Sequence, residues 1–170
     1  MRHVQSFAPI EEADARILIL GSMPGEASLR AGQYYAHPQN LFWRIMGELL
    51  GTDPASPYEQ RTQTLKSAQI ALWDVLRSCR RKGSLDSNID HESLVPNDFA
   101  AFFRCHPKIT RVFFNGAKAE ECYRRHVRPA TGIASIEYLR LPSTSPANAS
   151  ISYERKLEMW RAVTRPSKVL

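Results

Sequence analysis

Four short apolar runs, separated by longer segments in which apolar residues recur at helical spacing, constrain the fold of this chain more than any other feature. The runs lie at residues 16–21, 70–75, 111–115 and 136–141. Strands that alternate with helices form a parallel sheet covered by helices on both faces. We therefore expect an α/β fold, namely a three-layer α/β/α sandwich with a central four-stranded, mainly parallel sheet.

The segments between these runs carry the expected helices. Within residues 39–50, apolar side chains such as Leu41, Ile45 and Leu49 recur at helical spacing, and Gly51 stands where the helix should end. Further helices are expected at residues 57–67, at residues 96–105 with Pro96 opening the helix, from Gly116 onward, and around Leu157, Trp160 and Val163. The basic, polar segment 77–93 shows no period, so we expect a long loop there.

Length and cysteine content bound the class of protein. A chain of 170 residues that is 43% hydrophobic suits one compact domain, here residues 1–170, with no need of a disulfide or metal. The three cysteines, Cys79, Cys105 and Cys122, are widely spaced and lack a metal-binding pattern, which favours reduced thiols. Cys105 is expected to be buried on a helix, beside His106 in a loop.

The N-terminal residues give no sign of secretion. Residues 1–16 include three acidic side chains and no apolar stretch typical of a signal peptide. The longest apolar stretch, residues 17–20, is far too short to cross a bilayer. We expect a cytoplasmic protein without membrane contact.

The net charge of +6 and the calculated pI of about 9.5 indicate a negatively charged partner but do not identify its class. A basic protein can bind nucleic acid, an acidic membrane surface or a small anionic substrate. Arginine outnumbers lysine. This favours phosphate contacts, because a guanidinium group can hold two phosphate oxygens at once.

Two loops that follow the first strand carry residues suited to a binding site. Gly21 and Gly25 enclose Ser-Met-Pro and should let the backbone turn tightly and approach a ligand closely. Of the adjacent Tyr34 and Tyr35, at least one should be available to stack on a flat ligand. Asn40 stands at the start of the next helix, where it can either cap the helix or act in catalysis; both possibilities remain open.

These loops resemble the uracil-DNA glycosylase superfamily. Its mismatch-specific branch has a G-x-N-P-G turn and then F-A-H-P-x-N-x-F-W, and this chain has Gly-Ser-Met-Pro-Gly at 21–25 and Tyr-Ala-His-Pro-Gln-Asn-Leu-Phe-Trp at 35–43. Residues 141–149, Leu-Pro-Ser-Thr-Ser-Pro-Ala-Asn-Ala, are similar to the second motif of the superfamily, a P-S-x-x-S loop. Together the two motifs look most like the hypoxanthine-DNA (deoxyinosine) glycosylase branch.

The resemblance implies roles for the first motif. Asn40 matches the catalytic asparagine of the deoxyinosine branch and would hold the attacking water through its carbonyl group. Tyr35 matches the aromatic residue that stacks on a base swung out of the duplex. Backbone amides at Gly21, Ser22 and Met23 would meet the base. Met23 replaces the water-activating asparagine of the mismatch-specific branch, and a methionine side chain cannot orient water.

Three further residues have two possible roles each. His37 either donates a hydrogen bond to the base or shapes its loop, and we favour the second. Asn115, at the end of the third strand, either caps the next helix or contacts the base edge with its carboxamide. Asp74, at the end of the second strand, stands where the superfamily often keeps a base-recognising residue, although a carboxylate that faces DNA would need a partner.

The second motif implies contacts to the DNA backbone. Ser143, Thr144 and Ser145 are expected to hold the phosphates beside the extruded nucleotide. Residues 146–148 would press into the gap in the stack, with Pro146 and Asn148 at the two ends, and this weak wedge favours single-stranded or mispaired substrates. Of the basic clusters, Arg77, Arg80, Arg81 and Lys82 are expected to contact phosphate, whereas Arg124, Arg125 and Arg128 are expected to be a solvated face.

We therefore expect a monofunctional DNA glycosylase that hydrolyses the N-glycosidic bond of uracil or hypoxanthine in DNA and so initiates base excision repair. It should need no metal and no cofactor, since three cysteines cannot supply the four ligands of the iron–sulfur cluster found in some branches. We expect a monomer. The alternatives are a catalytically silent binder of damaged or single-stranded DNA, which Met23 would favour, and an enzyme acting on a small anionic substrate.

Overall fold

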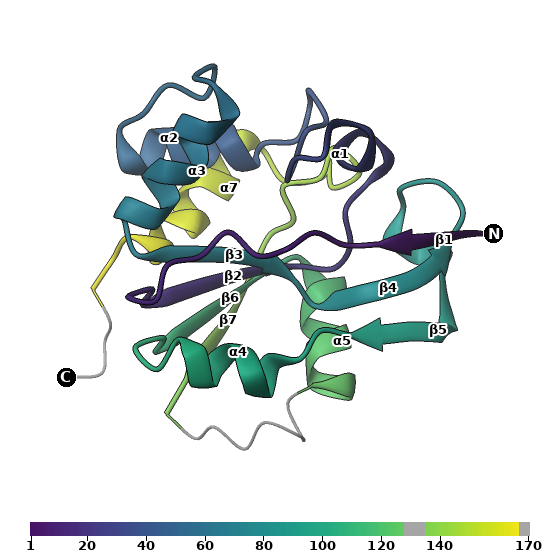
Figure 1. Cartoon of the computed structure of the whole chain (residues 1–170). Helices are drawn as coiled ribbons and strands as arrows, with labels where there is room; N and C mark the ends of the chain where they lie inside the picture. The colour runs from purple at the N-terminus through teal and green to yellow at the C-terminus, as the bar shows by residue number, and fades with distance from the viewer. Residues whose placement is uncertain (128–134, 167–170) are drawn as a thin grey trace.

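The computed structural model describes residues 1–127 and 135–166. Its central sheet has the strand order β3-β2-β6-β7, and all three neighbouring pairs are parallel (Figure 1). The strands are β2 (Ile17–Gly21), β3 (Ile70–Asp74), β6 (Arg111–Asn115) and β7 (Glu137–Leu141). The expected four-stranded parallel sheet is confirmed.

Helices cover both faces of this sheet, which confirms the three-layer arrangement (Figure 1). One face carries α2 (Phe42–Leu50), α3 (Tyr58–Ser67) and α7 (Tyr153–Trp160), and the other carries α4 (Phe99–Cys105) and α5 (Ala117–His126). Strand β2 supplies apolar side chains to both layers: Ile17 and Ile19 pack on the first side, and Leu18 and Leu20 on the second. Successive strand residues point to opposite faces, so a strand buried on both faces is a continuous apolar run.

A second, antiparallel sheet overturns the expectation of a long loop at residues 77–93. Its order is β1-β4-β5, formed by β1 (Arg2–Gln5), β4 (Leu76–Arg81) and β5 (Ile89–Pro96). Strand β4 continues directly from β3 and buries Leu76, Ser78, Cys79 and Arg81. Two of these are polar, and the pairing with β5 shifts register twice, so the sequence shows no regular apolar alternation. The short helix η1 (Asp86–Asn88) connects β4 to β5.

Several helix boundaries also differ from expectation. Pro96 ends β5 and does not open α4; Asp98 caps that helix by accepting a hydrogen bond from the amide of Ala101 at 3.0 Å. A short helix, α1 (Glu26–Ala31), lies in the segment after β2 that was expected to be a loop. The helix η2 (Arg161–Val163) follows α7.

The expectation for Cys105 and His106 is reversed. Cys105 ends α4 and is exposed, whereas His106 is buried and pairs with Glu11 at 2.9 Å. In the second basic cluster, Arg124 and Arg125 pair with Glu120 and Glu121 on the surface of α5, and Arg128 lies outside the described residues.

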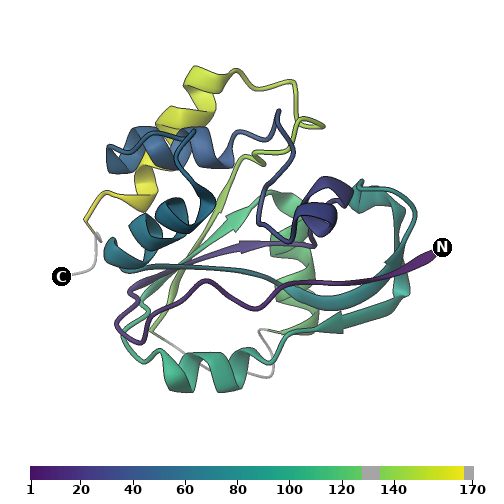
Figure 2. The same cartoon turned by 45° about the horizontal axis from the view of Figure 1, so that its top comes forward.

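The strand order determines where a site can form. The chain leaves β2 for β3 on one side and later returns to β6 on the other, which opens a crevice at the carboxyl ends of these strands. Gly21, Asp74 and Asn115 are the last residues of the three strands. The segment after β2 and the loop after β7 lie on the same side of the sheet, above these ends (Figure 2).

Candidate active site

A cavity of about 740 Å³ opens at the carboxyl ends of β2, β3 and β6. Segments far apart in sequence line it: the two loops of the first motif, the loop of the second motif, and the connection between β4 and β5. Of the residues expected to bind the base, those it brings together are Gly21, Ser22, Met23, Tyr35, His37, Asn40, Asp74 and Asn115.

The floor of the cavity lies around Gly21. A methyl group at this position would lie 2.6 Å from Oδ1 of Asp74 and 2.8 Å from Oη of Tyr35, so no side chain larger than hydrogen fits. Neither Gly21 nor Gly25 has a positive φ. A glycine at position 21 is therefore required for the close approach of two side chains, and not for the turn conformation that the sequence suggested.

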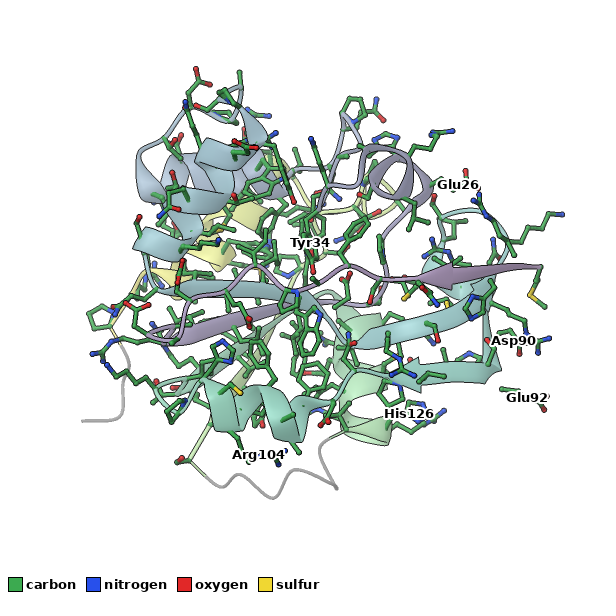
Figure 3. The ribbon with its side chains drawn as sticks, in the orientation of Figure 1. Glu26, Tyr34, Asp90, Glu92, Arg104 and His126 are labelled. Carbon is green, nitrogen blue, oxygen red and sulfur yellow. The ribbon has the colours of Figure 1, made fainter. Side chains whose placement is uncertain are left out.

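The two adjacent tyrosines occupy different environments. Tyr34 is buried in the interior (Figure 3), where its hydroxyl donates to the carbonyl oxygen of Ala8 at 2.8 Å. Tyr35 lines the cavity and packs its ring on Phe42, with ring centroids 4.3 Å apart. Its φ of 54° lies in the left-handed region, which costs free energy for a non-glycine residue and is found most often at functional sites.

The Tyr35 hydroxyl is buried and has no hydrogen-bond partner of acceptable geometry among the described residues. Burial raises the pKa of this phenol far above its usual value, and the negative charge of Asp74 raises it further, whereas the nearby Asn115 amide lowers it. Tyr35 is therefore a neutral group with an unused donor at the floor of the cavity.

Asn40 lies between the start of α2 and the cavity, so its capping contact is present while its catalytic role stays a prediction. Its Oδ1 accepts the amide hydrogen of Phe42 at 3.0 Å, which satisfies a free donor of the first turn of α2. The side chain also lines the cavity. An amide oxygen has two lone pairs, so Oδ1 can bind a water molecule while it holds Phe42.

The other residues of the first motif are also tied locally. His37 is exposed, and its Nδ1 accepts the amide hydrogen of Gln39 at 3.1 Å, so Nε2 carries the proton in the neutral ring. Ser22 is buried and donates from Oγ to Oδ1 of Asp86 at 2.6 Å. The side chain of Met23 packs in the core, which leaves its backbone as the part that can meet a base.

Asn115 fastens β6 to the loop of the second motif. Its Nδ2 donates to Oγ1 of Thr144 at 3.0 Å, and its Oδ1 accepts from the Thr144 amide at 2.9 Å. The helix-cap alternative is wrong, because α5 begins after Gly116 without a side-chain cap. Thr144 is 0% exposed, so the expectation that it holds a phosphate is also wrong.

The rest of the second-motif loop keeps donors available. Oγ of Ser143 accepts from the Ser145 amide, and Oγ of Ser145 accepts from the Ala147 amide, both at 3.2 Å. In both bonds the hydroxyl oxygen is the acceptor, so its own O–H remains free for a phosphate oxygen. Pro146 and Ala147 form the exposed tip, whereas Asn148 donates back to the Ser143 carbonyl at 3.2 Å.

Two aspartates line the cavity: Asp74 at the end of β3 and Asp86 in the short helix η1. Burial raises the pKa of Asp74 to about 7; the charge of Asp86 raises it as well, and Arg81 opposes both effects. Burial also raises the pKa of Asp86, although the hydrogen bond from Ser22 and the charges of Arg81 and Lys118 lower it.

The first arginine cluster does not act as one surface. Arg81 is 1% exposed and donates to the carbonyl oxygens of Gly83 and Pro24, so the expectation that it contacts DNA is wrong. It ties the first-motif turn to the β4–β5 hairpin. Arg80 is exposed and pairs with Asp90 at 2.7 Å, and Arg77 is exposed on β4.

Sequence analysis missed two residues. Asp86 reaches the cavity from a segment taken for a loop. That segment holds three acidic residues, and the sequence did not distinguish Asp86 from Asp90 and Glu92. Lys156 of α7 is 2% exposed and donates to the carbonyl oxygen of Asn148 at 2.7 Å, which holds the second-motif loop in place. Nothing in the sequence distinguished it from a surface lysine.

Fold and site together define an α/β/α enzyme whose ligand pocket lies at the switch point of a parallel sheet, with polar side chains converging on it. A sequence profile of the Uracil DNA glycosylase superfamily matches residues 8–164. The chain belongs to this superfamily, and it is a DNA glycosylase, an enzyme that hydrolyses N-glycosidic bonds in DNA.

Known proteins are similar over nearly the whole chain. A hypoxanthine DNA glycosylase of Methanosarcina acetivorans is 39% identical over 162 residues, which cover 95% of this chain and 98% of the relative. Another, from Methanosarcina barkeri, is 38% identical over 153 residues, covering 89% and 92%. The solution NMR structure of a candidate uracil DNA glycosylase from Methanosarcina acetivorans superposes with a TM-score of 0.78 and 36% identity, covering 96% of this chain and 100% of that one.

None of the described helices is long and apolar enough to span a bilayer.

Proposed function

We propose that this enzyme removes hypoxanthine from DNA, as a monomeric, single-domain, monofunctional glycosylase, and that uracil is the poorer substrate. The observation that carries the proposal is the convergence of both motif loops on one cavity around Gly21. The similarity to two hypoxanthine DNA glycosylases supports the choice of base.

The chemistry of the cavity suits a hydrolytic reaction. Breaking the glycosidic bond develops positive charge on the sugar and negative charge on the departing base. No lysine is among the described residues that line the cavity, so they offer no amine nucleophile. In the proposed mechanism, Asn40 holds a water molecule below the anomeric carbon, and this water attacks as the bond breaks.

The rest of the cavity positions the nucleotide. The flipped base lies against Tyr35, and stacking on an aromatic ring contributes about 1–3 kcal/mol. The amides near Ser22 and Met23 face the base, and His37 shapes the loop. Ser143 and Ser145 offer hydroxyl donors to the flanking phosphates.

The tip of the second-motif loop bears on the choice between single and double strands. Pro146 and Ala147 are exposed but small, so they fill little of the gap that a flipped nucleotide leaves. Opening an intact base pair should therefore depend on how weak that pair already is. We propose that the enzyme prefers mispaired or single-stranded deoxyinosine.

The test is base release from oligonucleotides that carry one deoxyinosine or one deoxyuridine, in single strands and in duplexes, followed by alkaline cleavage of the abasic site. Cleavage of the deoxyinosine strand at a higher single-turnover rate than the deoxyuridine strand is expected. A protein that cleaves only the deoxyuridine strand, or neither, would contradict the proposal.

Substitution of Asn40 tests the catalytic role. Asn40→Ala should lower the single-turnover rate at least about a hundredfold, because an unpositioned water attacks far less often, while DNA affinity stays nearly the same. Gln39→Ala changes the neighbouring exposed side chain, which does not line the cavity, and is the matched control. Equal rates for the two variants would show that another group positions the water.

A further inference from the structure

The carboxyl group of Asp74 has an unusual environment for an acid. It ends β3 at the floor of the cavity, and the residue is 3% exposed. Its Oδ2 is buried and has no hydrogen-bond partner among the described residues. Within those residues, no lysine, arginine or histidine lies at ion-pair distance from it. A buried carboxylate without such partners costs several kcal/mol, so the group favours its neutral form.

Most of the described groups around Asp74 reinforce this preference, and among them Arg81 alone opposes it. Tyr34 and Tyr35 come from the segment before α2, and neither supplies positive charge. Asp86 comes from η1 and adds a negative charge. Arg81 from β4 is the one nearby cation whose effect on Asp74 is resolved, but its hydrogen bonds go to two backbone carbonyl groups.

The positive charge of Lys118 lowers the pKa of Asp86. The pKa of Asp74, raised to about 7, agrees with this geometry.

Deaminated bases present the chemical group that a neutral carboxylic acid complements. Deamination replaces an amino group by a carbonyl oxygen and places an N–H beside it. A neutral carboxyl group can donate its O–H to that oxygen and accept the N–H, whereas a carboxylate can only accept. The negative charge that develops on the departing base then strengthens the O–H···O bond in the transition state.

We propose that Asp74 works as a neutral carboxylic acid, donating its O–H to the carbonyl oxygen of the deaminated base while the glycosidic bond breaks. The bonding electrons leave with the base as an anion, and the proton stays on Asp74. Attack by water forms the hydroxyl group of the sugar, and the proton that the water loses neutralises the departed base. This inference rests on the proposed function and adds a donor that recognises the base. The charged form of Asp74 would instead repel the same oxygen.

The experiment compares Asp74→Asn, Asp74→Ala and the wild-type enzyme by single-turnover base release between pH 5.5 and 9. Asparagine keeps a donor and an acceptor but cannot ionise. The wild-type rate should fall about tenfold per pH unit above pH 7, as the acid loses its proton. Asp74→Asn should remain within about tenfold of the wild-type rate at pH 6 and lack this decline. Asp74→Ala should be at least about a hundredfold slower than the wild-type enzyme at pH 6 and should also lack the decline.

A second variant changes the pKa of Asp74 but leaves the Asp74 carboxyl group itself in place. Asp86→Asn removes the neighbouring charge and keeps an acceptor for Ser22, so the decline should begin at a lower pH. Circular dichroism of each variant verifies that it is folded. If the wild-type protein releases the base but Asp74→Asn is as slow as Asp74→Ala at pH 6, the inference about Asp74 is wrong and the proposed function stands. A wild-type protein that releases no base would overturn the proposed function instead.

Discussion

A methyl group at Gly21 perturbs the site at its most crowded point. In Gly21→Ala the new Cβ would lie 2.6 Å from Oδ1 of Asp74 and 2.8 Å from Oη of Tyr35. Ordinary contact needs a separation near 3.5 Å, so these oxygens must retreat by roughly 0.7–0.9 Å. Neither can do so freely, because Asp74 is buried at the end of β3, where that strand pairs with β2, and the Tyr35 ring packs on Phe42.

Two magnitudes follow from this displacement. Overpacking a well-packed interior destabilises a protein by about 1–3 kcal/mol. Misplacing groups around the reacting atoms by about 1 Å costs on the order of a hundredfold in rate. We therefore expect Gly21→Ala to lose about 1–3 kcal/mol in its free energy of unfolding and 10- to 100-fold in base release.

The assay pairs urea unfolding with single-turnover release of hypoxanthine from an oligonucleotide. Gly25→Ala is the matched control, because a methyl group there would meet only Ser84, at 3.4 and 3.5 Å, in ordinary contact. This control should behave like the wild-type protein in both measurements. If Gly21→Ala releases the base within threefold of the wild-type rate, the crowded floor does not position the catalytic groups.

Three further predictions concern buried charges. Lys156→Met removes the donor that holds the second-motif loop and should weaken single-strand binding about 5- to 30-fold in a fluorescence-anisotropy titration, whereas Lys66→Met on α3 should change it less than about twofold. Arg81→Met should lower the free energy of unfolding by roughly 2–5 kcal/mol in urea, and the exposed Arg80→Met by at most about 1 kcal/mol; equal losses would refute the structural role of Arg81. The folded protein binds the Asp74 proton more tightly than the unfolded chain, so stability falls as the pH rises from the usual aspartate pKa of 3.8 to the raised pKa of about 7. Asp74→Asn should therefore be more stable than the wild-type protein at pH 8, by a margin that shrinks toward pH 4.

Local patterning determined the sheet and the placement of both motif loops. Strands buried on two faces must be continuous apolar runs, and residues 17–20 and 112–114 are apolar for that reason. Loops that follow parallel strands meet at one edge of the sheet, so the order of the motifs along the chain was enough to bring Tyr35, Asn40 and Ser143 to one cavity.

Pairing between distant segments was decided only by the tertiary structure. Arg81 can be buried on β4 because the carbonyl oxygens of Gly83 and of Pro24, 57 residues away in sequence, accept its hydrogen bonds. Asn115 and Thr144, 29 residues apart, use on each other the hydrogen bonds that the sequence had assigned to DNA. The proton on Asp74 likewise depends on its burial and on Asp86. Desolvation and hydrogen-bond satisfaction are properties of the space between segments, and a linear pattern of residue types does not encode them.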